Sequence, residues 1–163
     1  MRWRPAYVGL GSNLAEPEQR VRAALAGLAR LDETLLVAQS RLWRSRPMGP
    51  VAQPDFVNAV AGLLTRLEAL DLLAALKALE RALGREEPVV RWGPRVIDLD
   101  LLMLGNDVHD APGLQLPHRG MHERDFVLYP LAELAPALWI PGRGRVDRLL
   151  SDARGGGLSP LPQ

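Results

Sequence analysis

Hydrophobic residues recur along the chain with two different periods, and these periods predict where helices and strands lie. The spacing predicts a first helix from about Pro17, because proline suits a first helical turn. It predicts a second helix with Asp71 as its N-cap and Gly84 just past its end. Each helix is expected to bury one apolar stripe. The two stripes are Val21, Leu25, Leu28 and Leu31, and Leu72, Leu76, Leu79 and Leu83.

Strand-like apolar segments surround these helices and are separated by loops rich in proline and glycine. They cover residues 6–14, 35–45, 54–65 and 95–104. The order strand, helix, strand, strand, helix, strand predicts an α+β fold, a ferredoxin-like α/β sandwich in which helices pack on a sheet that contains antiparallel strands. We expect residues 1–154 to form a single domain and the tail "GGGLSPLPQ" (155–163) to be disordered.

Composition narrows the class of protein. The 163 residues are 47% hydrophobic and 24% charged, with a net charge of +1, which is typical of a globular domain and gives no overall attraction to nucleic acid or anionic lipid. Cysteine is absent, which excludes disulfides and a thiolate nucleophile. No apolar run approaches the roughly 20 residues that span a bilayer. We expect a cytoplasmic monomer that binds neither nucleic acid nor membrane.

Two aspartates interrupt the apolar run "RVIDLDLLML" (95–104). Alternation in a strand puts Asp98 and Asp100 on one face, roughly 6.8 Å apart, with Ile97, Leu99, Leu101 and Met103 on the other. Carboxylates at this spacing repel each other unless a cation lies between them, and Mg²⁺ prefers oxygen ligands of this kind. The alternative is a solvated strand edge on which Arg91 or Arg95 pairs with the carboxylates.

Other polar residues leave similar alternatives open. Phe56 and Asn58 share a strand face, where a ring and an amide could hold a flat heterocycle, or could equally be an ordinary core phenylalanine and a turn asparagine. His118 or Arg124 could contact a phosphate, or lie on the surface. The turn "GLGSNL" has Leu14 where a dinucleotide-binding motif requires glycine, and no P-loop motif is present.

Four segments together resemble the 6-hydroxymethyl-7,8-dihydropterin pyrophosphokinase family of the folate pathway. They are "YVGLGSNL", "QPDFVNAV", "RWGPRVIDLDLL" and "LPHRGMHERDFVLYPLAELAP", which extend over nearly the whole chain. The resemblance implies an ATP-dependent pyrophosphokinase with two Mg²⁺ ions. Such an enzyme transfers pyrophosphate from ATP to the hydroxyl of the pterin and releases AMP.

The resemblance also implies roles for individual residues. The residues expected to act in catalysis are Asp98, Asp100, Arg85 and Arg95, with Asp98 and Asp100 as the metal ligands. The pterin site is expected to consist of Ser45, Met48, Phe56, Asn58 and Phe126. The ATP site is expected to consist of Glu80, Arg85, Trp92, Arg95, Leu101, His118 and Arg124.

The sequence departs from the family pattern at a few positions and leaves other functions to consider. Glu87 stands where a basic residue is common, and Phe56 stands where tyrosine is common. Gly113, Gln115 and Arg119 replace polar or aromatic residues that some members use around ATP. The alternatives are a ferredoxin-like RNA-binding module and a non-catalytic regulator that binds a nucleotide or pterin. The first lacks its aromatic-rich strand motif here, and two aspartates on the sheet face would repel RNA.

Overall fold

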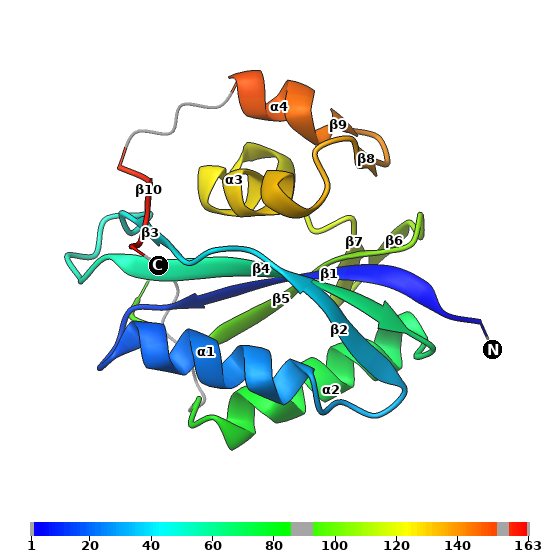
Figure 1. Cartoon of the computed structure of the whole chain (residues 1–163), viewed down its shortest axis with the longest axis horizontal. Coiled ribbons are helices and arrows are strands. Elements are labelled where there is room, and N and C mark those ends of the chain that lie inside the picture. Colours follow the sequence, from blue (N-terminus) through cyan, green and yellow to red (C-terminus); the bar gives the residue numbers. More distant parts are fainter. Residues whose placement is uncertain (1, 86–92, 153–156, 163) are drawn as a thin grey trace.

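A computed structural model describes residues 2–85, 93–152 and 157–162, although the side chains of residues 151 and 152 are not described. Its centre is a six-stranded sheet that separates two layers of helices (Figure 1). Helices α1 (Pro17–Leu28) and α2 (Ala69–Ala82) cover one face. Helices α3 (Asp125–Leu134) and α4 (Val146–Asp152) lie over the other.

The sheet follows the order β10-β3-β4-β1-β5, and β2 also pairs with β4. All pairs are antiparallel. The strands are β1 (Arg4–Ser12), β2 (Thr34–Gln39), β3 (Trp43–Ser45), β4 (Phe56–Thr65), β5 (Asp98–Leu104) and β10 (Ser159–Pro160). With β2 and β3 sharing one edge of β4, this is the ferredoxin-like order, and the predicted α+β class is confirmed.

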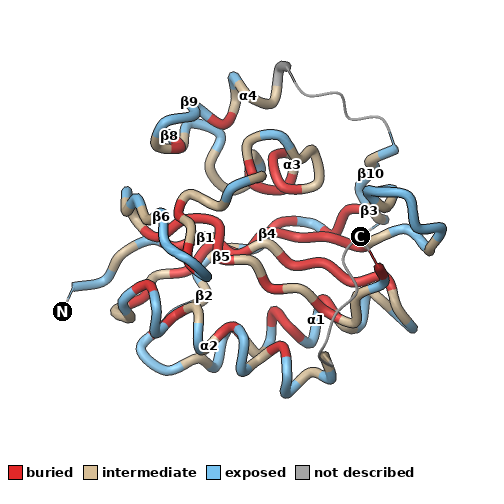
Figure 2. The backbone as a smooth tube through the Cα atoms, turned by 180° about the vertical axis from the view of Figure 1, so that it is seen from behind, coloured by how far each residue is buried: buried red, intermediate tan, exposed pale blue. Residues whose placement is uncertain are grey.

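Two hydrophobic clusters hold the layers together, one on each face of the sheet (Figure 2). In the first cluster, Val21, Leu25 and Leu28 of α1 meet Leu72 and Leu76 of α2, as the apolar stripes predicted. In the second, Val127 and Leu131 of α3 pack on Val60, Leu102 and Met103 of the sheet. The sheet is therefore buried on both faces over much of its area.

Smaller elements complete the chain. Strands β6 (His109–Ala111) and β7 (Leu114–Leu116) form a hairpin, and a 3₁₀ turn, η1 (Met121–Glu123), leads into α3. A second short hairpin of β8 (Trp139–Ile140) and β9 (Gly144–Arg145) precedes α4. No helix in the described ranges is long and apolar enough to cross a membrane.

Several predicted boundaries were wrong. The segment 35–45 is two strands, because Ser40 forms hydrogen bonds to Val60 through both its amide and its Oγ, both at 2.9 Å, which interrupts the strand. Helix α2 begins at Ala69 after Glu68 as N-cap, so Asp71 lies in the first turn, where its charge favours the helix dipole. The strand expected over 95–104, after the loop 85–94, begins only at Asp98.

The prediction for Met103 was also wrong. Tyr7 pairs with Met103 and Val8 with Leu101, which leaves Leu102 as an extra residue in a β-bulge. The bulge reverses the alternation, so that Met103 lies with the second cluster while Leu99 and Leu101 remain in the first. A bulge of this kind leaves no mark in the hydrophobic pattern, because both faces of the strand are buried.

The expectation of a disordered tail does not hold for Ser159–Pro160. These residues form β10, which pairs with Trp43 and Arg44 of β3. The amide of Leu161 then donates to the carbonyl oxygen of Leu42 at 2.9 Å, and its side chain packs against the first cluster. Residues 155, 156 and 163 lie outside the described residues.

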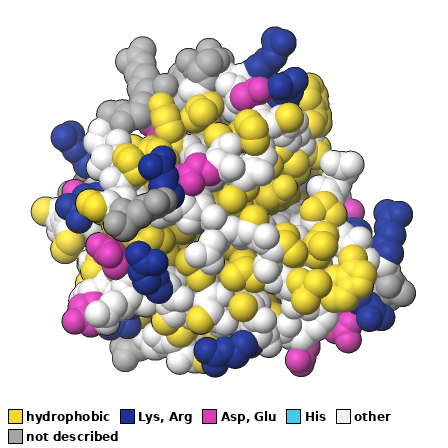
Figure 3. All heavy atoms as spheres, viewed as in Figure 1, with side chains coloured by type: hydrophobic (Ala, Val, Ile, Leu, Met, Phe, Trp, Pro, Cys, Tyr) yellow, Lys and Arg dark blue, Asp and Glu magenta, His cyan; other side chains and the backbone are white. Residues whose placement is uncertain are grey.

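Figure 3 shows many hydrophobic side chains on one face of the molecule, interspersed with charged ones. The exposed hydrophobic residues include Leu35 and Val37 of β2, with 51% and 54% of their surface accessible.

Candidate active site

Most of the predicted site residues meet at one end of the sheet, where β1 and β3 end and β4 and β5 begin. Gly11 of β1 pairs with Asn58 on one side and with Asp98 on the other. Directly paired residues point to the same face of a sheet, so the amide and the carboxylate lie on the face of the second cluster. Asp100 follows two residues later and pairs with Gly9.

Asp98 lies between two arginines. The Nη1 atom of Arg85 is 3.1 Å from its Oδ1, and Nε of Arg95 is 3.5 Å from its Oδ2. Burial and the neighbouring charge of Asp100 nevertheless raise the pKa of Asp98 from 3.8 to about 6, against the opposing effect of the arginines. Asp98 is therefore easier to protonate than an ordinary aspartate, although two arginines lie beside it.

Glu80 of α2 connects this cluster to the backbone of β5. Its Oε2 accepts hydrogen bonds from the Leu99 amide at 2.7 Å and from Nη1 of Arg85 at 2.6 Å. Burial raises the pKa of Glu80, although both hydrogen bonds and the charge of Arg85 oppose the shift. Because Glu80 is only 5% exposed and both contacts use one oxygen, it fixes Arg85 beside Asp98.

Asn58 is buried and held from the adjacent strand. Its Nδ2 donates to Oγ of Ser45 at 2.6 Å, and Ser45 pairs with Phe56 across the sheet. The amide and the ring share a face, as predicted, with Val57 and Ala59 on the other face in the first cluster. Met48, in the loop that follows Ser45, is 42% exposed.

Asn13 is a residue of this site that sequence reasoning missed. Its Nδ2 donates to Oε1 of Gln53 at 2.8 Å and to the carbonyl oxygen of Pro54 at 2.9 Å. Its Oδ1 accepts the Arg95 amide at 2.8 Å. Asn13 therefore connects the two loops that flank the site, one before Phe56 and one before Asp98. The sequence signal for Asn13 was the polar pair Ser12 and Asn13 at the end of the apolar segment "GLGSNL", which we interpreted only as a turn.

The third part of the site comes from the segment before α3. His118 is anchored to β5, because its amide donates to the carbonyl oxygen of Leu102 at 2.8 Å. Burial lowers the pKa of His118, with the charge of Arg124 acting in the same direction and that of Asp100 opposing it. The Arg124 guanidinium lies 5.8 Å from the centre of the Phe126 ring, and Phe126 packs against the second cluster.

One predicted ATP-site residue, Leu101, stands apart from these contacts. Leu101 is buried in the first cluster, so only its backbone could meet a ligand. Trp92 and Glu87 lie outside the described residues.

The donor set fits Mg²⁺ bound together with a phosphate ligand. Within residues 2–85, 93–152 and 157–162, no group of three or more His, Asp or Glu side chains could hold a metal ion alone. Two carboxylates, one with a pKa raised in part by the other, match the usual protein share of a Mg²⁺ site, in which water and phosphate oxygens complete the shell.

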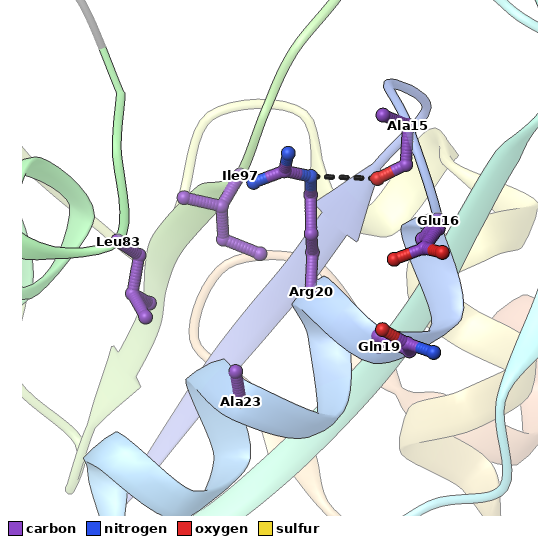
Figure 4. A pocket seen from close by; sticks show the side chains of 7 residues that line it. All are labelled: Ala15, Glu16, Gln19, Arg20, Ala23, Leu83 and Ile97. Carbon is purple, nitrogen blue, oxygen red and sulfur yellow. Dashed lines mark hydrogen bonds between the residues drawn. The ribbon is translucent and has the colours of Figure 1, made fainter.

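A pocket of about 290 Å³ lies on the opposite face, between the start of α1 and the end of α2 (Figure 4). Glu16, Arg20 and Leu83 line it together with Ile97, and Nε of Arg20 donates to the carbonyl oxygen of Ala15 at 2.8 Å. It contains none of the predicted site residues.

Known proteins are similar to this chain over most of its length. A 2-amino-4-hydroxy-6-hydroxymethyldihydropteridine pyrophosphokinase from Pseudomonas aeruginosa is 51% identical over 156 residues, which cover 96% of both chains. A protein of the same name from Haemophilus influenzae is 43% identical over 145 residues, covering 89% of this chain and 90% of the relative.

A solved structure of Plasmodium falciparum HPPK-DHPS shares the fold. The TM-score is 0.72 at 13% identity, and the match covers 93% of this chain and 44% of the larger one. Residues 7–136 match one family throughout. The chain belongs to the 7,8-dihydro-6-hydroxymethylpterin-pyrophosphokinase family.

Proposed function

We propose that this chain transfers the pyrophosphoryl group of ATP to the hydroxymethyl oxygen of 6-hydroxymethyl-7,8-dihydropterin, giving AMP and the pterin diphosphate for folate biosynthesis. One observation carries the assignment of residues. Asn58, which could read the polar edge of a heterocycle, and Asp98, which could hold Mg²⁺, are separated on the same sheet face by a single glycine. A bound pterin and the phosphates of ATP would thus meet over β1.

The pterin is assigned to the Asn58 side. Phe56 and Phe126 would hold the ring, the carboxamide of Asn58 would read its donor and acceptor edge, and Ser45 keeps that carboxamide oriented through its 2.6 Å hydrogen bond. Met48, exposed at the start of the flanking loop, would meet the pterin through its backbone.

The triphosphate is assigned to the other side. Arg85 and Arg95 already lie beside Asp98 and would contact the phosphate oxygens, with His118 and Arg124 contacting them from the α3 layer. Glu80 holds Arg85 in this position. Trp92 and the backbone of Leu101 are further ATP contacts that the family resemblance implies.

The reaction needs alignment and charge neutralisation more than a strong base. The hydroxymethyl oxygen attacks the β-phosphorus, the bond from that phosphorus to the bridging oxygen of the α-phosphate breaks, and AMP leaves. Asp98 and Asp100 would hold Mg²⁺, two ions in this proposal, which when bound neutralises phosphate charge and makes the attacking hydroxyl more acidic. The arginines and the flanking loops orient ATP and exclude water, which would otherwise be the acceptor.

We extend the proposal to a monomer in the cytoplasm that acts on these two small molecules. Neither a nucleic-acid partner nor a membrane is required, and no observation favours the RNA-binding or regulator alternatives over the family's reaction.

Carboxylate variants test the assignment of residues. Asp98→Asn and Asp100→Asn should each reduce pterin-dependent release of AMP by at least about 100-fold, because both remove charge at which the metal would bind. Asp110→Asn is the matched control, since Asp110 is exposed in β6, where its Oδ1 accepts a hydrogen bond from Nε2 of Gln115 at 3.3 Å. Full activity in either site variant would contradict the assignment.

A further inference from the structure

Gly11 occupies the centre of the candidate site, yet its backbone does not require glycine. It lies within β1, is buried and does not adopt a positive φ. Glycine in a strand interior weakens the strand and often marks a place where another group approaches closely. Its presence between Asn58 and Asp98 therefore needs a reason other than backbone conformation.

The reason lies in the contact that a side chain would make. A Cβ atom at Gly11 would be 3.2 Å from Oδ1 of Asn58 and 3.8 Å from Cδ1 of Phe56. The first distance is shorter than an ordinary van der Waals contact, so the carboxamide would have to move by a few tenths of an ångström. The carboxamide has little freedom to move, because Asn58 is 4% exposed and its Nδ2 already donates to Ser45 at 2.6 Å.

The carboxamide oxygen over Gly11 is also available to a ligand as an acceptor. Among the described residues, no hydrogen bond to this oxygen is found, whereas one of the two N–H donors of the carboxamide is used by Ser45. A flat ring that donates hydrogen bonds along one edge, as a pterin does, could use this acceptor only if the space above β1 is empty.

We propose that Gly11 is a positioning and specificity-determining residue of the pterin site: its missing side chain sets the place of the Asn58 carboxamide oxygen and leaves room for the ring edge above β1. This inference rests on the proposed function, in which Asn58 reads the pterin. Gly11 acts through Asn58 and has no part in the chemical step.

The test compares Gly11→Ala with Gly9→Ala, two residues earlier on the same strand and face. The three atoms nearest to a Cβ at Gly9 would be side-chain atoms of Leu102, at 3.6 to 3.8 Å, which is ordinary contact. Dissociation constants for 6-hydroxymethyl-7,8-dihydropterin and for ATP, together with kcat and KM, are measured for both variants, for Asn58→Ala and for the double variant Gly11→Ala/Asn58→Ala.

We expect Gly11→Ala to weaken pterin binding by about five- to tenfold, the typical effect of one lost hydrogen bond, and to raise KM for the pterin more than it lowers kcat. ATP affinity should not change, and Gly9→Ala should match the wild type. In the Asn58→Ala background, Gly11→Ala should weaken pterin binding little further, because the carboxamide that the new Cβ would displace is absent.

Three results would overturn the inference: equal pterin affinity in Gly11→Ala and Gly9→Ala, additive losses in the double variant, or a double variant that fails to fold. If Gly11→Ala alone fails to fold while the double variant folds and binds pterin like Asn58→Ala, the contact with Asn58 is supported as the cause. A wild-type chain that binds no pterin would instead contradict the proposed function, and this is measured before any variant.

Discussion

Asn13 and Arg95 are joined twice: Oδ1 of Asn13 accepts the Arg95 amide at 2.8 Å, and the Asn13 amide donates to the Arg95 carbonyl oxygen at 3.1 Å. The same side chain donates to Gln53 and Pro54 in the other flanking loop. The buried side chain of Asn13, just after β1, thus holds both the loop that precedes Asp98 and the loop that precedes Phe56.

Asn13→Ala should therefore affect both loops at once. It leaves the Arg95 amide and the Pro54 carbonyl oxygen without their side-chain partner, which should lower the free energy of unfolding by about 1–3 kcal/mol. Activity should also fall under conditions in which the variant is fully folded, since the loops that carry Arg95 and Phe56 both lose a hydrogen bond to Asn13. Urea denaturation and steady-state kinetics measure the two effects. Asn106→Ala, at an exposed turn, is the control, and identical kinetics in both variants would contradict a role for Asn13 at the site.

Asp98 should make stability depend on pH in the absence of metal. Its pKa is about 6 in the folded chain against an ordinary 3.8, so ionisation costs stability. The cost is absent below about pH 4, grows as pH rises through this interval and is complete above the folded pKa.

Asp98→Asn removes that cost. With EDTA at pH 8, the variant should be more stable than the wild type by up to about 3 kcal/mol, and by less after solvent screening, whereas at pH 4 the two should be equal. Thermal unfolding at both pH values measures this difference. Lower stability of the variant at pH 8 would show that the arginine contacts outweigh burial and repulsion.

Glu80 should be needed for both fold and site. Glu80→Ala leaves the buried Leu99 amide without its acceptor and frees Arg85 from its 2.6 Å contact, so we expect a loss of about 2–3 kcal/mol and a higher KM for ATP. Glu80→Gln keeps one oxygen for the Leu99 amide and should recover part of the stability. Equal stability of the two variants, measured by urea denaturation, would contradict the role of this hydrogen bond.

The C-terminal strand gives a further prediction. Removal of residues 157–163 deletes β10 and exposes the edge of β3, the strand that presents Ser45 to Asn58. The shortened chain should melt at a lower temperature and bind pterin more weakly, with unchanged ATP affinity. Binding titrations of both ligands check this. Wild-type pterin affinity in the truncated chain would show that β3 needs no support from β10.

The parts of the molecule that follow periodicity could be predicted from the sequence. Pro17 begins α1, the leucine stripes of both helices are packed in one cluster, and Asn58 points away from the first cluster while Val57 and Ala59 belong to it, because each depends on local spacing alone. The assignment of individual site residues came from the resemblance to a family and remains a prediction until the variants are measured.

The parts that could not be predicted depend on distant contacts. Ser40 interrupts a strand through hydrogen bonds to Val60, and the bulge at Leu102 is visible only in the pairing with β1. Asn13 connects loops that lie 40 and 82 residues away in the sequence. The composition of the C-terminal tail is typical of disorder, and it gave no sign that Ser159 and Pro160 would pair with the edge strand β3.

The most direct test of the central claim is product analysis of the purified chain with ATP, Mg²⁺ and 6-hydroxymethyl-7,8-dihydropterin, with AMP and ADP separated. We predict pterin-dependent AMP together with an equal amount of pterin diphosphate. ADP in place of AMP, or AMP formed without pterin, would contradict pyrophosphoryl transfer at this site.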